Sequence, residues 1–193
     1  MNFPLELKFK VLALAPQLSV TDSSGQLMFY VKQKLFKLKE AVTVFGDQEQ
    51  TRTLFQIKAD KIIDFSATYH ITDSDGRPVG AVKRKGARSI FKAHYEIIED
   101  GQVTMTITED SAFVRLMDGI FGELPIVGIL SGYVFHPSYT VKRGETELMR
   151  MTKQSAFLEG KFKIEELAQN EGIVRARCVL SLLMMVLLER SRG

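Results

Sequence analysis

The chain has 193 residues, of which 45% are hydrophobic and 25% charged, so it can build a sizeable core and is not an intrinsically disordered chain. Its formal net charge of +3 is too small to indicate nucleic-acid binding by itself. A single cysteine, Cys178, excludes an internal disulfide framework and a cysteine-built zinc site, and it fits a reducing compartment.

Before residue 179 the dominant hydrophobic period is two, which is typical of half-buried strands. Strands are expected around residues 7–14 and 27–35, and the alternation is strongest at 65–72, 103–108 and 161–165. Within the fourth of these runs, Val103, Met105 and Ile107 are expected to share one face. The turn signals between the runs are Gly46-Asp47, Asp73-Ser-Asp-Gly76, Asp100-Gly101 and Arg143-Gly144. Because Asp-Gly favours tight hairpins, the pattern predicts one antiparallel sheet of about a dozen strands.

The run Val179–Leu188 is apolar around its whole circumference, which is typical of a helix buried on all sides. A membrane-spanning helix needs about 20 apolar residues, and this run is much shorter. We therefore expect a central buried helix, with a membrane anchor as the alternative. Its most buried residues are expected to be Leu182, Leu183, Val186 and Leu187.

A sheet of about 12 strands tends to close, because open edges invite aggregation. Closure leaves an interior too wide for strand side chains to fill, and the apolar helix has the shape to fill it. The sequence therefore predicts a mainly β fold, a closed antiparallel β-barrel of about 12 strands enclosing a hydrophobic C-terminal helix. With no linker-like segment, residues 1–193 are expected to form one domain.

The segment 112–136 breaks the strand pattern with five glycines and one proline among apolar residues. We expect a short helix near 113–121 and irregular structure after it, packed over one end of the barrel. The alternative is a protein-interaction module that exposes Phe121, Ile126 and Ile129.

Catalytic and metal-binding motifs are absent from the sequence. The histidines, His70, His94 and His136, lack metal-ligand spacing, and the Asp73–Gly76 cluster is explained by a hairpin turn rather than by calcium. No nucleophile elbow, P-loop or dinucleotide-binding glycine pattern occurs. We expect no cofactor, no metal and no enzyme, although an unrecognised site assembled from distant residues stays an alternative.

Basic residues concentrate between Gly76 and Tyr95, where six stand without any acid. This segment suits phosphate groups, and the candidate anion-binding residues are Lys83, Arg84, Lys85, Arg88 and Lys92. A solvated outer strand face is the alternative. Nucleic acid is not expected, because stacking aromatic residues are sparse here.

Strand alternation limits this basic segment, since Lys83 and Lys85 share one face and Arg84 lies on the other. The odd-numbered face also carries Val79 and Ala81. Either a bulge intervenes near Gly86, or Arg84 alone lies outside.

Four segments in this order resemble the LURP-one-related family, in the superfamily of the tubby C-terminal domain and the phospholipid scramblases. They are Gln26–Glu40, Tyr69–Gly76, Val79–Lys85 and Phe157–Glu166, the last followed by the apolar helix. The resemblance implies a closed barrel of about 12 strands around one hydrophobic helix, as the strand period also predicts. Tubby-like domains bind phosphoinositide head groups.

The resemblance therefore implies a non-enzymatic binding or scaffold domain with anionic phospholipid head groups, a membrane surface or a protein as its partner. We expect a cytoplasmic protein, peripheral to the membrane. A scramblase-like lipid protein is the remaining alternative, although a helix enclosed by a barrel cannot also span a bilayer.

Overall fold

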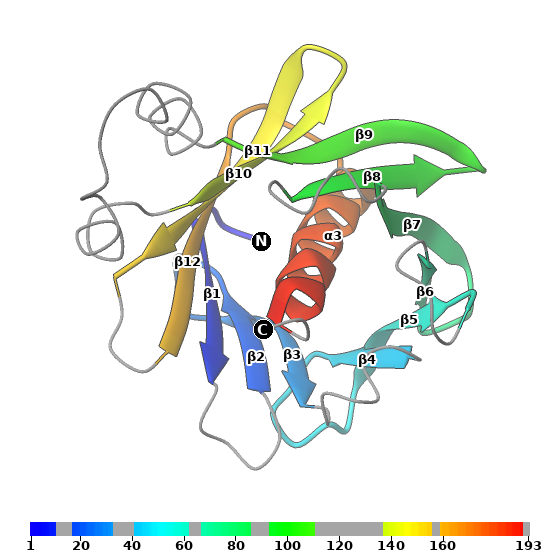
Figure 1. Ribbon diagram of the computed structural model, residues 1–193. Helices are drawn as coiled ribbons and strands as arrows, with labels where there is room; N and C mark the ends of the chain where they lie inside the picture. The colour runs from blue at the N-terminus through cyan, green and yellow to red at the C-terminus, as the bar shows by residue number, and fades with distance from the viewer. Residues whose placement is uncertain are drawn as a thin grey trace, which may run out of the picture.

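In the part of the chain that the computed structural model describes, twelve strands form a closed barrel around one long helix (Figure 1). The structure describes residues 1–10, 17–32, 41–61, 67–85, 93–110, 137–155 and 159–190. The predicted fold class, a closed antiparallel barrel that encloses a C-terminal helix, is confirmed.

The strands of the first half are β1 (Leu5–Lys10), β2 (Gln17–Thr21), β3 (Leu27–Lys32), β4 (Ala41–Phe45), β5 (Thr53–Ala59) and β6 (Thr68–Asp73). Those of the second half are β7 (Pro78–Arg84), β8 (His94–Glu99), β9 (Gln102–Glu109), β10 (Ser138–Arg143), β11 (Thr146–Gln154) and β12 (Glu159–Glu166). The helix α3 (Gly172–Arg190) follows them.

Each strand pairs antiparallel with its neighbours in the sequence, and the pairing of β1 with β12 closes the barrel. In this closing pair Leu5 lies opposite Ile164, and Lys10 opposite Glu159. In the described residues every strand has a neighbour on both sides, so closure protects the backbone groups that an open edge would present.

Helix α3 fills the barrel interior. The continuous stretch from Ala176 to Leu187 is buried, and Leu182, Leu183, Val186 and Leu187 are at most 4% exposed. The helix starts seven residues before the apolar run that predicted it, at Gly172, so it also carries Arg177 into the interior. The alternating residues of the strands pack against it: Leu5, Leu7 and Phe9 of β1, for example, are no more than 2% exposed.

Two of the predicted hairpin turns are present at aspartate–glycine pairs in the described residues, Asp75-Gly76 and Asp100-Gly101. Asp100 and Gly101 connect β8 to β9 with φ angles of 49° and 77°, the left-handed backbone that a two-residue hairpin of this kind requires. At the β6–β7 turn, one carboxylate oxygen of Asp73 accepts hydrogen bonds from the backbone N–H groups of Asp75 and Arg77, at 2.9 and 2.8 Å. The acidic cluster at this turn therefore caps a hairpin.

One expectation about β9 is wrong. Met105 and Ile107 are buried, but Val103 is 52% exposed and does not share their inner face. The reason is a β-bulge: Ile97 pairs with Met105 while Ile98 pairs with Val103, so Thr104 is an extra residue that reverses the alternation.

Candidate functional site

Lys83 of β7 and Lys85, which directly follows β7, lie on the outer side of the barrel, and Arg84 points into the barrel. The flanking Val82 is fully buried in the core, so Arg84 shares its inner face. The Arg84 Nε lies 3.5 Å from Glu189 Oε1 near the end of α3, and only 12% of its side chain is exposed. The arrangement in which Arg84 alone lies outside is therefore wrong.

The inward position of Arg84 follows from a bulge in β7. This bulge lies at Val79, several residues before the position near Gly86 where a bulge was expected. Ile71 pairs with Gly80 while Thr72 pairs with Pro78, so Val79 is the extra residue. Because the alternation shifts there, Val79 and Val82 both reach the core. Gly80 accommodates the shift with a φ of 149°, which L side chains rarely adopt.

The outer faces of β5 and β6 continue the basic surface of β7. Lys58 of β5 pairs with His70 of β6, and both are exposed. On the other side of β6, His70 pairs with Ala81 of β7 and Thr68 pairs with Lys83. Lys83 is therefore the diagonal neighbour of His70 on the outer face. We call Lys58, His70, Lys83 and Lys85 the β5–β7 basic surface.

This surface contains one ion pair that reduces its charge: Lys85 Nζ lies 3.2 Å from Glu96 Oε1 on β8. Among the described residues, no carboxylate lies within 4 Å of the ammonium groups of Lys58 or Lys83. His94, next to Lys85, has its imidazole pKa lowered by burial and then by the Lys85 charge. The surface thus keeps an excess of positive charge.

The other candidate residues of this segment, Arg88 and Lys92, lie outside the described residues, as does the segment 112–136 with its expected helix and apolar patch. Of the three histidines, His136 also lies outside them. Within the described ranges, no group of three or more His, Cys, Asp or Glu side chains is arranged to hold a metal ion.

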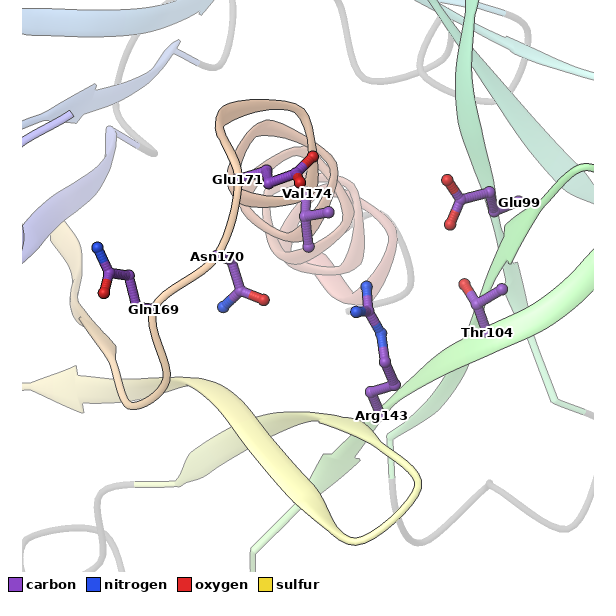
Figure 2. A pocket seen from close by; sticks show the side chains of 7 residues that line it. All are labelled: Glu99, Thr104, Arg143, Gln169, Asn170, Glu171 and Val174. Atoms are coloured by element: carbon purple, nitrogen blue, oxygen red, sulfur yellow. The ribbon is translucent and has the colours of Figure 1, made fainter.

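The mouth of the barrel at the N-terminus of α3 contains a polar cavity of about 610 Å³ (Figure 2). Its lining comes from the ends of β8, β9 and β10, the connection after β12 and the first turn of α3. The lining residues are Glu99, Thr104, Arg143, Gln169, Asn170, Glu171 and Val174. Acidic and basic groups both face it, so it has no single charge preference.

Next to this cavity, Arg177 fixes the helix to the barrel wall. Its side chain is 5% exposed, its Nε donates to the backbone carbonyl of Val79 at 2.5 Å, and its Nη1 lies 2.6 Å from Glu99 Oε2. A Cβ on Gly80 would come within 2.9 Å of Arg177 Nε, so the β7 glycine makes room for the guanidinium. Arg177 stands just before the apolar run in the sequence, whereas its partners Val79 and Glu99 are far from it in the chain.

The opposite mouth, at the C-terminus of α3, combines a hydrogen-bonded carboxylate with a smaller cavity. The Tyr95 hydroxyl donates to Glu189 Oε1 at 2.5 Å, and burial is the main cause that raises the pKa of this tyrosine. Tyr139 lines the cavity of about 260 Å³ beside them, and burial raises its pKa to about 12. Sequence reasoning missed this site, because its residues belong to strands and a helix that are far apart in the chain.

Cys178 lies in the interior on α3 and is fully buried. Its Sγ contacts the Met105 Sδ at 3.7 Å, and burial raises the pKa of its thiol to about 11. A protonated, inaccessible thiol is a packing group rather than a nucleophile, as the sequence also indicated.

A family model described as LURP-one-related matches residues 27–165, well over half of the chain. The chain belongs to the LURP-one-related family. The LURP-one-related match runs from the first residue of β3 into β12, and it confirms the resemblance carried by the sequence segments. No curated protein and no solved structure matches the chain significantly.

In the part of the chain that the structure describes, no helix combines the length and the apolar character needed to cross a membrane.

Proposed function

We propose that this LURP-one-related chain is a non-enzymatic binding or scaffold domain whose β5–β7 basic surface binds anionic phospholipid head groups, phosphoinositides in particular. The observation that carries the proposal is the outward position of Lys83 and Lys85 beside the exposed Lys58. Membership of the LURP-one-related family and the barrel fold support a binding role. The lone, buried Cys178 supports a cytoplasmic location.

The proposed attachment is weak and depends on salt. Each lysine close to an anionic membrane contributes about 1 kcal/mol, and salt screens that attraction within about 10 Å at 0.1 M. Lys85 contributes less than the other two because Glu96 already pairs with it. Arg84 is not part of the proposed surface, since it faces Glu189 inside the barrel. Arg88 and Lys92 follow β7 in the sequence and remain candidate contributors.

The test is sedimentation of the protein with vesicles that contain phosphatidylinositol bisphosphate, at low and at moderate salt. The variant Lys58→Gln/Lys83→Gln/Lys85→Gln removes three charges from the basic surface. We expect its binding at low salt to fall at least about tenfold, because losing even two contributions of about 1 kcal/mol exceeds that factor. Binding of the parent should weaken markedly at moderate salt.

The matched control carries the same three changes on the opposite wall of the barrel, at Lys10, Lys161 and Lys163 of β1 and β12 (Figure 1). There Lys161 pairs with Glu6 at 2.5 Å and Lys163 with Glu165 at 2.6 Å, so carboxylates already neutralise much of the charge. The control should bind vesicles like the parent. Absence of parent binding at low salt, or equal loss in both variants, would refute the proposed surface.

A further inference from the structure

The cavity at the C-terminal mouth of the barrel has an apolar floor and a charged rim. The floor consists of Phe162, Met185 and Val186, which are 6%, 1% and 4% exposed. The rim is formed by exposed cationic side chains, Lys153 of β11 and Arg190 at the end of α3. Pro137, Tyr139 and Glu189 complete the lining. An apolar surface next to charged groups suits a molecule with a hydrocarbon part and an ionised end.

The rim carries an excess of positive charge. Glu189 is its one acidic side chain among the described lining residues, and it already accepts the Tyr95 hydroxyl and lies 3.5 Å from Arg84 Nε. Among the described residues, neither Lys153 nor Arg190 has a carboxylate within 4 Å. The two cations are therefore available to an anion, whereas the Glu189 carboxylate is engaged on its inner side.

The position of Arg190 is defined by its neighbours. Its guanidinium carbon lies 5.5 Å from the centroid of the Phe9 ring, and its Nη2 lies where a Cβ on Gly160 would come within 2.9 Å. The guanidinium therefore lies over the Phe9 ring, in the space that Gly160 leaves, at the rim of the cavity.

We propose that this cavity binds a short-chain anionic amphiphile, its hydrocarbon chain on Phe162, Met185 and Val186 and its anionic head between Lys153 and Arg190. The cavity volume of about 260 Å³ lies below the roughly 300–1,000 Å³ of sites for drug-sized ligands, so the chain it accepts is short. This inference goes beyond the β5–β7 basic surface: it concerns a different wall, and a single dissolved molecule rather than a membrane.

The probe is octanoate, kept below its micelle-forming concentration, and binding is measured by isothermal titration calorimetry with the full chain. Three matched compounds separate the contributions: octanol lacks the charge, octylammonium reverses it, and acetate lacks the chain. We expect octanoate to bind at least about tenfold more tightly than octanol or octylammonium, because a hydrogen bond to a charged group is worth about tenfold or more. It should exceed acetate by a similar factor, because each buried CH2 group contributes about 0.8 kcal/mol. Octyl phosphate, tested in parallel, distinguishes a carboxylate from a phosphate head.

Two rim variants test the assignment, Lys153→Glu and Arg190→Glu, and each should weaken octanoate binding at least about tenfold. Lys32→Glu is the control, since this exposed lysine of β3 makes the same charge change without lining the cavity. Melting curves show whether each variant is folded. If Arg190→Glu does not fold, Lys153→Gln provides the second rim variant, with a smaller loss.

The proposal is overturned if octanoate does not bind, if octylammonium binds equally well, or if the rim variants bind octanoate like the parent. The triple variant of the β5–β7 basic surface should retain full octanoate binding. Failure of this inference is therefore distinguishable from failure of vesicle binding.

Discussion

The two ends of helix α3 meet the barrel in different ways. At the N-terminal end, Arg177 is buried and makes its contacts with Glu99 and the Val79 carbonyl inside the wall. At the C-terminal end, Arg190 is exposed, stacks on Phe9 and lies beside an apolar cavity. At the N-terminal end the cationic side chain is bound to groups of the barrel wall, whereas at the C-terminal end the cationic side chain is exposed. The N-terminal end should therefore contribute more to stability, whereas the C-terminal end carries the cavity of the proposed amphiphile site.

The largest effect is expected between the two ends, at Leu183, which is fully buried. Leu183→Asp places an unpaired charge in the interior, at a cost of several kcal/mol, which is comparable to the whole stability of a domain. The variant should fail to give soluble, folded protein. Expression and circular dichroism check this outcome.

Ile173→Asp is the matched control on the same helix, because Ile173 is 48% exposed in the first turn. A carboxylate near a helix N-terminus is favourable, so this variant should fold with nearly parental stability. A soluble Leu183→Asp variant with an unchanged melting temperature would contradict the enclosure of α3.

The next prediction compares the arginines at the two ends directly. Arg177→Leu leaves the Val79 carbonyl without its donor and Glu99 without its partner, and should lower the free energy of unfolding by about 2–3 kcal/mol. This loss of stability is smaller than for a fully buried ion pair, because 36% of the Glu99 side chain is exposed. Arg190→Leu loses one exposed cation–π contact and should cost about 0.5–1 kcal/mol. Urea denaturation measures both, and equal losses would remove the distinction between the ends.

Alanine substitutions at two glycines, one next to each arginine, also compare the two ends of α3. Gly80→Ala places a Cβ 2.9 Å from both Arg177 Nε and the Ile98 carbonyl oxygen, at a φ of 149°, and should destabilise the fold by about 1–3 kcal/mol. Gly160→Ala meets the Arg190 Nη2 at 2.9 Å, the far end of a flexible side chain that can move away. Its cost should stay below about 0.5 kcal/mol, since fewer unfolded conformations offset the contact. Thermal melts of the two variants decide between these outcomes.

A smaller effect than those of Arg177→Leu and Gly80→Ala is expected for the tyrosines at the C-terminal mouth. Tyr95→Phe removes the hydrogen bond to the partly exposed Glu189 and should cost about 1 kcal/mol. Tyr139→Phe is the control, because the Tyr139 hydroxyl makes no hydrogen bond with any described residue, and it should cost less. A larger loss for Tyr139→Phe in urea denaturation would contradict the role given to the Tyr95–Glu189 contact.

Much of the architecture could be predicted because it depends on local patterns. The period of two predicts which strand residues face inward, and the all-round apolar run predicts the central helix. The β9 expectation failed at Val103, because a bulge changes the alternation without changing the composition. Gly80 within β7 was a readable signal for the second bulge, since glycine inside a strand often marks one.

The charged contacts inside the barrel could not be predicted in the same way. Arg177 meets Glu99, and Glu189 meets Tyr95, only because the barrel closes and sets the depth of the helix. Nothing near any of these residues in the sequence specifies the partner. The basic segment was visible from composition, but only the strand pairing shows that Arg84 points inward and that Lys58 joins the outer surface.

The order of elements has a consequence for synthesis. On a ribosome, all twelve strands emerge before α3, and the closing partner of β1 is β12. Until residues 172–190 are made, the inward-facing apolar side chains of the strands lack the helix they pack against, so the nascent sheet exposes them to solvent. Chains that stop before α3 should therefore be bound by chaperones or aggregate.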